Sequence, residues 1–259
     1  VQRDVLKDAK IEAAGGIEVH GIIENGEIRT GGDLIVRGGI RQSEGNRIVA
    51  EGGVNAEFID GGYIQAKKDI VVEREIINAT IHTLGAVIIP KGSIVGGEIV
   101  ALRGIYVGRA GSRTYTPTVL VAGADFNVRG KQNIKKMKKK RIEEEITQLK
   151  NFVETAIANS ESAPTSSQEK YKEQLDKISR LEEELQGLIE EEKELESQSQ
   201  GRAKNIVEVK QTLYPKTTIC LEDERLTVEE EYAGPIEAKI VDGEIKFEKG
   251  GKSPDMIEL

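Results

Sequence analysis

Short apolar segments recur at a regular interval through the first half of the chain. Each has an aliphatic residue first, a small residue two positions later, and apolar residues at its seventh and ninth positions. Successive segments begin 16 to 21 residues apart, at Ile11, Ile28, Ile48, Ile64, Ile81, Ile99 and Leu120. A repeat of this length, in which no single copy can bury its apolar side alone, predicts a solenoid.

The spacing within a repeat predicts two short strands joined by a corner. Side chains alternate along a strand, so positions one, three, seven and nine all point into the interior. Position three is always Ala or Thr, and position seven is always apolar: Ile17, Leu34, Val54, Ile70, Val87, Ile105 and Phe126. A third apolar site at Ile22, Ile40, Ile76 and Ile94 predicts a triangular coil. Seven coils about 4.8 Å apart make a prism roughly 30 Å tall.

The predicted fold class is therefore mainly β, a parallel β-helix. The left-handed hexapeptide helix of acyltransferases is a competitor with a repeat of similar length. Its small residue follows the aliphatic one by four positions, whereas here the separation is two. Right-handed or bactofilin-like winding is favoured, although the periodicity itself leaves the handedness open.

After Val128 the apolar spacing changes to that of helices. One set steps by four and three residues, and a second set follows a similar heptad seam: Ile142, Ile146, Leu149, Val153 and Ala156, then Tyr171, Leu175, Ile178, Leu181, Leu185, Leu188 and Leu195. A polar segment with Pro164, Ala158–Ser167, separates the two sets. This pattern predicts an inserted antiparallel coiled-coil hairpin, with helices of about 30 residues and a length of about 45 Å.

The charges of the two helices support this pairing. Basic residues cluster near the start of the first helix and acidic residues near the end of the second: Lys135, Lys136, Lys138, Lys139, Lys140 and Arg141, then Glu190, Glu191, Glu192, Glu194 and Glu196. Folding the hairpin brings these two ends together. Nucleic acid or acidic lipid is the alternative partner for the basic cluster. The acidic cluster opposite, the lack of interleaved aromatic residues and the net charge of −8 argue against nucleic acid.

From Ile206 the sequence again resembles strand. The segment TLYPKTTIC, Thr212–Cys220, aligns with VIIPKGSIV, Val87–Val95. We therefore predict a β-helix over residues 1–129, a coiled-coil insertion over 130–203, and return strands over 204–259 that complete or cap the β-helix. Asp242-Gly243 indicates a final two-residue hairpin, and residues 250–259 are expected to form a loose tail.

Few residues are of the types that catalyse reactions or bind cofactors and metals. Aromatic residues make up 4% of the chain, Trp is absent, and the single cysteine, Cys220, excludes a disulfide framework. His20 and His82 are the two histidines, and we expect His82 to occupy a solvated outward position. Acidic residues are scattered among the corners rather than stacked. We therefore predict no catalytic, cofactor-binding or metal-binding residues and no enzyme activity.

Localisation follows from equally simple features. No apolar run approaches the length of a membrane span, and no signal-peptide pattern opens the chain, so no membrane insertion is expected. A single cysteine suits a reducing compartment, and we expect a cytoplasmic protein.

One set of residues departs from the expected polarity. The eighth repeat position points outward, yet it holds Ile35, Val71, Ile88 and Tyr106. The second position adds Val49, Val100 and Val121. Outward apolar residues on stacked coils form a patch that is costly to expose to water. Either the C-terminal segment or a partner is expected to cover it.

Two long runs resemble a known family. They read GGIRQSEGNRIVAEGGVNAEFIDGGYIQAKKDIVV and IVGGEIVALRGIYVGRAGSRTYTPTVLVAG, and TLYPKTTICL follows the helices. Together they are similar to flagellar assembly protein A, with Lys216 where that family usually has Gly. The resemblance extends from about Ile11 to Leu221. It implies a cytoplasmic bacterial protein, without that family's N-terminal domain, that acts in flagellar or cell-pole organisation.

The expected function is thus a non-enzymatic scaffold that binds protein partners. A bactofilin-like β-helix that assembles into filaments is the alternative, because a free solenoid end exposes unpaired backbone groups. A β-helix acyltransferase or carbohydrate-active enzyme is a distant third. The identity of the partner is open, and a homo-oligomer is possible.

Overall fold

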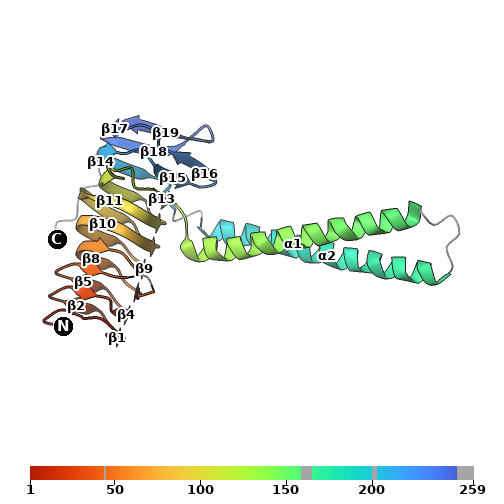
Figure 1. The fold of residues 1–259 in the computed structure, drawn as a ribbon, viewed down its shortest axis with the longest axis horizontal. Helices are drawn as coiled ribbons and strands as arrows, with labels where there is room; N and C mark the ends of the chain where they lie inside the picture. The colour runs from red at the N-terminus through yellow and green to blue at the C-terminus, as the bar shows by residue number, and fades with distance from the viewer. Residues whose placement is uncertain (44, 159–164, 200–202, 250–259) are drawn as a thin grey trace. The chain divides into compact units, whose positions relative to one another are not determined.

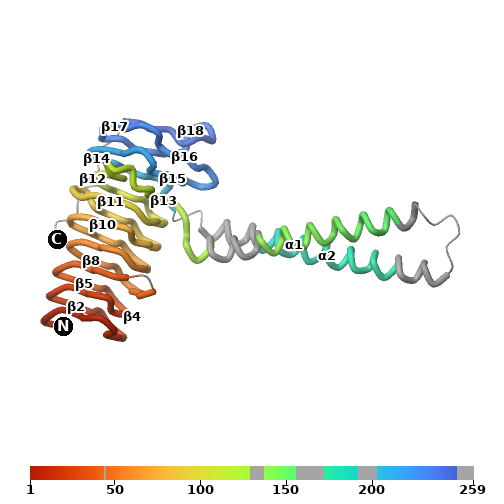
Figure 2. The backbone as a smooth tube through the Cα atoms, in the orientation of Figure 1, coloured from red at the N-terminus to blue at the C-terminus, as the bar shows by residue number. Residues whose placement is uncertain are grey.

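A computed structural model describes residues 1–43, 45–158, 165–199 and 203–249 (Figures 1 and 2). Within the helices, the side chains of 129–136, 156–158, 165–171 and 192–199 are outside this description. The chain divides into two compact units. One comprises Val1–Phe126 with Arg202–Leu259, and the other comprises Asn127–Gly201.

The first unit is a parallel β-solenoid with three faces (Figure 1). The first face contains β1 (Lys10–Ala13), β4 (Glu27–Thr30), β7 (Arg47–Ala50), β9 (Tyr63–Ala66), the ends of β10 (Ile70–Thr83) and β11 (Val87–Ala101), β13 (Thr118–Ala122) and β15 (Thr217–Leu221). The second contains β2 (Ile17–Val19), β5 (Leu34–Val36) and the starts of β8 (Val54–Asp60), β10, β11, β12 (Ile105–Ala110) and β14 (Val207–Leu213). The third contains β3 (Ile23–Glu24), β6 (Ile40–Arg41) and later parts of β8, β10, β11, β12 and β14.

Equivalent residues stack from coil to coil. On the first face the aliphatic position forms a continuous column that begins with the half-buried Ile11, and from the second coil onward its members have 0% exposure: Ile28, Ile48, Ile64, Ile81, Ile99, Leu120 and Ile219. Position three beside it is also buried, with Ala66 and Ala101 at 0% exposure. The predicted mainly-β solenoid with a helical insertion is therefore confirmed, while its handedness stays a prediction.

The third face corrects one predicted core position. Ile23, and not Ile22, points inward: Ile23 has 0% exposure and pairs with Ile40, whereas Ile22 is half-buried. Ile23 lies six residues after Ile17, and Ile40 lies six residues after Leu34. Both of these coils therefore place the inward residue of the third face six positions after the inward residue that opens the second face.

The seventh coil corrects two further predictions. Phe126 is not the inward seventh residue, because the chain leaves the solenoid there and Phe126 begins α1 (Phe126–Ala158). Val207, after the helices, takes that place and pairs with Ile105. The predicted alignment of the return segment is also wrong, because Thr212 pairs with Arg109 on the third face. The interrupted coil resumes on the second face, several residues before the matching TLYPKTTIC motif.

Antiparallel strands close the C-terminal end of every face. β16 (Glu224–Thr227) pairs with β15 on the first face, while β18 (Ile236–Val241) and β17 (Tyr232–Ala233) pair with β14 on the second and third. β19 (Glu244–Lys249) pairs with β18. Asp242 and Gly243 join them with φ of 55° and 81°, as a type I′ hairpin turn requires. The reversal of direction ends the parallel stack.

One corner of the solenoid depends on left-handed backbone. Residues leading from the third face to the first have positive φ: Asn25, Gly61, Asn78, Gly96, Gly111 and Lys216. Most are Gly or Asn, which adopt this conformation at little cost. Lys216 keeps the same geometry with a φ of 60°. The corner shape is thus retained where Lys replaces the expected Gly.

The second unit pairs α1 with α2 (Thr165–Ser199). A small core lies between the helices: Ile142, Ile146, Val153, Ile178 and Leu188, with Leu149, Leu181 and Leu185 packed against it. Two ion pairs beside this core show that the helices are antiparallel, because the later residue of α1 pairs with the earlier residue of α2. The pairs are Lys138–Glu184 at 2.7 Å and Glu145–Lys177 at 2.8 Å. A supercoil of the two helices stays a prediction.

The predicted pairing of the two charge clusters stays a prediction. Lys138 pairs with Glu184, which lies outside the predicted acidic cluster. Five members of the two clusters lie outside the described side chains: Lys135, Lys136, Glu192, Glu194 and Glu196. The same holds for the predicted seam residues Ala156, Tyr171 and Leu195. Residues 159–164, within the predicted connection, and the predicted tail 250–259 also lie outside the described residues.

Candidate functional site

The predicted apolar patch lies on the outer surface of the second face. Val71 pairs with Ile88, and Ile88 pairs with Tyr106, so three apolar side chains occupy one position on consecutive coils. Ile35 stands in the same line, separated from Val71 by Asn55. All four apolar residues are half-buried. We call Ile35, Val71, Ile88 and Tyr106 the outer column.

Charged residues stand at both ends of the outer column. Glu18 precedes Ile35 and accepts a hydrogen bond from Arg37 Nε at 3.0 Å. Glu208 follows Tyr106 and has 6% exposure. Burial raises the pKa of Tyr106, and the carboxylates of Glu208 and Glu237 raise it further. The hydroxyl of Tyr106 is a hydrogen-bond donor, and it stands at one end of the apolar stripe.

The second-position residues do not extend this surface as predicted. Val100 and Val121 point away from the solenoid interior, but their exposures are 1% and 4%. Val49 is half-buried. The prediction that these side chains point outward is correct, but the prediction that all three form an exposed patch is wrong.

His82 also differs from its prediction. Instead of standing in solvent, its ring is half-buried between two aromatic side chains. The Tyr63 ring meets it edge-on with centroids 5.2 Å apart, and the Phe126 ring stacks on it at 5.5 Å with planes 24° apart. Period-2 alternation indicates only that His82 points outward. It carries no information on residues that reach it from other coils.

Hydrogen bonds organise this group. Tyr63 Oη lies 3.1 Å from Gln65 Oε1 and 3.1 Å from His82 Nδ1. If Tyr63 donates to Gln65, its oxygen accepts from a protonated Nδ1. The Arg47 guanidinium lies over the Tyr63 ring, 4.5 Å from its centroid. Burial raises the pKa of Tyr63, and Arg47 partly offsets this. The arrangement packs and orients rings rather than presenting a nucleophile.

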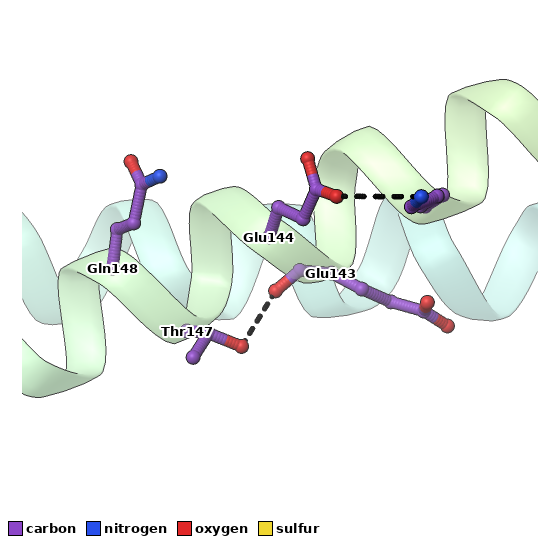
Figure 3. A pocket seen from close by; sticks show the side chains of 5 residues that line it. Glu143, Glu144, Thr147 and Gln148 are labelled. Atoms are coloured by element: carbon purple, nitrogen blue, oxygen red, sulfur yellow. Dashed lines mark hydrogen bonds and ion pairs between the residues drawn. The ribbon is translucent and has the colours of Figure 1, made fainter.

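The concave regions belong to ordinary surface. One lies on α1, where Lys140, Glu143, Glu144, Thr147 and Gln148 project from a single helix (Figure 3). Thr147 Oγ1 donates to the Glu143 carbonyl at 2.8 Å, and Lys140 pairs with Glu144 at 3.9 Å. Another lies on the third face, where Arg41 pairs with Asp60 at 3.6 Å. Their polar groups bond to one another, as expected of a solvated surface.

The described residues contain neither a metal-binding cluster nor a helix suited to a membrane. Among the described residues, no cluster of three or more His, Cys, Asp or Glu side chains could hold a metal ion. Within the same part of the chain, neither helix contains a stretch long and apolar enough to span a membrane.

Comparison with known proteins gave one match. The model of the flagellar assembly protein A β-solenoid domain matches residues 1–245. The matched region includes the solenoid, the helical insertion and nearly all of the closing strands. No curated protein and no solved structure matches the chain.

Proposed function

Since this chain belongs to the flagellar assembly protein A family, we propose that it is a non-enzymatic scaffold that binds a protein partner during flagellar assembly. Family membership suggests the biological setting. The outer column supports the mode of action, because contiguous apolar side chains on a surface commonly mark protein contacts. We also propose that the protein acts in the cytoplasm.

The solenoid is suited to this role by its rigidity. Val71, Ile88 and Tyr106 are spaced by the strand separation, about 4.8 Å, and so form a continuous stripe. Each strand also carries inward residues that are fully buried, such as Ile70, Val87 and Ile105. The stripe is therefore fixed before binding, which lowers the entropic cost of association.

A charge in the centre of the stripe tests the proposal. Ile88→Lys places an ammonium group between Val71 and Tyr106, whereas Asn55→Lys places the same group at a polar position of the same line. Each variant replaces the native gene in a flagellated host, and flagella are counted by electron microscopy. We expect Ile88→Lys to reduce flagellar number and Asn55→Lys to leave it unchanged. Equal counts for wild type and both variants, with equal melting temperatures, exclude the outer column as the contact.

Filament formation is the competing proposal. End-to-end assembly continues the parallel stack of coils from one copy to the next, and antiparallel strands end that stack at the C-terminal end of all three faces. We therefore expect the purified protein to remain unpolymerised. Regular unbranched filaments at micromolar concentration, seen by electron microscopy, contradict the scaffold-only proposal.

A further inference from the structure

Four side chains form a continuous stack outside the first face. Arg47 lies over Tyr63, Tyr63 meets His82 edge-on, and His82 stacks on Phe126. The first three residues come from β7, β9 and β10, which are successive strands of the face. Phe126 is the residue at which the chain leaves the solenoid. The stack therefore connects the interior coils of the molecule to the departure point of the insertion.

Main-chain hydrogen bonds hold both ends of the insertion against residues 101–105 of the solenoid. At the departure end, Gly123 N donates to the Ala101 carbonyl at 2.9 Å. At the return end, Lys204 N donates to the Leu102 carbonyl at 2.9 Å, and Ile206 accepts from Ile105 N at 3.0 Å. A Cβ on Gly123 would lie 3.2 Å from Asn205 Cα, so the two ends touch. Three residues beyond Gly123, Phe126 places its ring on His82.

We propose that the stack of Arg47, Tyr63, His82 and Phe126 is a latch that holds the departure segment, residues 123–126, against the first face. The ring contacts are few, whereas the coils are held by many main-chain bonds and by a continuous buried core. The departure segment therefore opens and closes as a local unit while the coils beneath it remain folded. The inference is independent of the scaffold function.

The hydrogen bonds of the stack favour the closed state. Tyr63 Oη contacts both Gln65 and His82, which fixes the imidazole in the orientation that Phe126 meets. Tyr63 and His82 thus act as positioning residues for Phe126. Replacing Tyr63 removes that orientation without touching Phe126 itself, and this separates the latch from a simple effect of the Phe126 side chain on the helix.

Hydrogen–deuterium exchange of the whole chain tests the latch. We expect Phe126→Ala to raise amide exchange in residues 123–128 by tenfold or more and to leave residues 105–110 of β12 unchanged. Phe126→Tyr keeps the aromatic ring, and its amide exchange in residues 123–128 should equal that of the wild type. Phe152→Ala is the matched control, because Phe152 lies on the same helix with 59% exposure. Tyr63→Leu should raise amide exchange in the same residues, 123–128, by a smaller factor than Phe126→Ala does.

Two results overturn the proposal. If Phe126→Ala and Tyr63→Leu both exchange as the wild type does, the stack holds nothing. If either variant raises exchange equally in β12 and in residues 123–128, the stack is part of the solenoid's global stability and no local latch exists.

Discussion

The solenoid and the helix pair bury apolar side chains in different ways. In the solenoid, a side chain such as Ile64 lies between identical residues above and below and has 0% exposure. In the helix pair, buried residues keep 5% to 9% exposure, because one seam between two cylinders is all that covers them. A solenoid position is therefore constrained in size from several directions, while a helix position needs mainly an apolar side chain of adequate length.

Ion pairs lie on the surface of both regions, as Arg74 and Glu57 do at 2.8 Å between two coils, but the solenoid also has buried polar groups with a separate role. On the helices, Lys150 pairs with Glu182 and Lys177 pairs with Glu145, and each pair crosses from one helix to the other. In the solenoid, the buried polar group Thr118 bonds only to backbone: it accepts from Gly96 N and donates to the Thr116 carbonyl. Surface ion pairs are thus common to both regions, whereas the solenoid also buries a hydroxyl group that shapes one of its backbone corners.

Removing the helices is the strongest test of this difference. If each region has its own core, replacing residues 130–202 with a short Gly/Ser linker should abolish the helical circular dichroism signal and keep the strand signal. The linker has little distance to span, because Gly123 and Asn205 are adjacent. Loss of both signals contradicts the division into independent cores.

The next largest effect concerns size in the solenoid core. Ala66→Leu inserts a larger side chain where exposure is 0%, and such overpacking costs about 1–3 kcal/mol of unfolding free energy. Gln65→Leu, at the adjacent half-buried outward position, removes the acceptor of the Tyr63 hydroxyl but overpacks nothing, and should cost less, about 0.5–1.5 kcal/mol. Thermal and urea melts measure both. A more damaging Gln65→Leu means that the inward and outward phases are reversed.

Two threonines stacked on neighbouring strands allow a finer comparison. Thr118→Val leaves the amide of Gly96 without its acceptor and should cost about 1–3 kcal/mol. Thr217 Oγ1 is buried without a hydrogen-bond partner among the described residues. Thr217→Val should therefore be neutral or stabilising by about 1 kcal/mol. Urea melts of the two variants give the answer, and equal destabilisation contradicts the assignment of hydrogen bonds.

The smallest effect belongs to the ion pairs of the helices. Lys150 and Glu182 approach to 2.7 Å, but both side chains are about half exposed. A double-mutant cycle with Lys150→Ala and Glu182→Ala should give a coupling of about 0.2–1 kcal/mol. The coupling should fall in 1 M salt, because screening acts strongly on exposed charges. A salt-independent coupling indicates that the pair is less solvated than its exposure implies.

The sequence predicts the solenoid well because stacking repeats one physical constraint. Ile28, Ile48 and Ile64 occupy equivalent environments, so a single pattern identifies all three. Phe126 shows where this reasoning fails: it satisfies the pattern, but the following residues continue as helix and remove it from the coil. Period alone contains no information on where a chain departs from its repeat.

The surface was less predictable than the core. The outward direction of Val71, Ile88 and Tyr106 follows from alternation, and the structure places them side by side. Alternation also places His82 outside, but it does not show that the ring of Phe126, from the segment that leaves the solenoid, stacks on the His82 ring. Contacts of that kind depend on three-dimensional proximity, which a linear pattern does not encode.

The interruption of the seventh coil has a consequence for synthesis on the ribosome. Val207 covers Ile105, but 80 residues separate it from Phe126 in the chain. At about 5–20 residues per second, that separation corresponds to roughly 4–16 s of translation. During this interval the edge of β12 that later pairs with β14 has no partner strand, and the inward side chains of Ile105 and Val107 lack the coil that stacks on them in the folded protein. The nascent protein therefore passes through a defined period in which its solenoid is folded but open at one end.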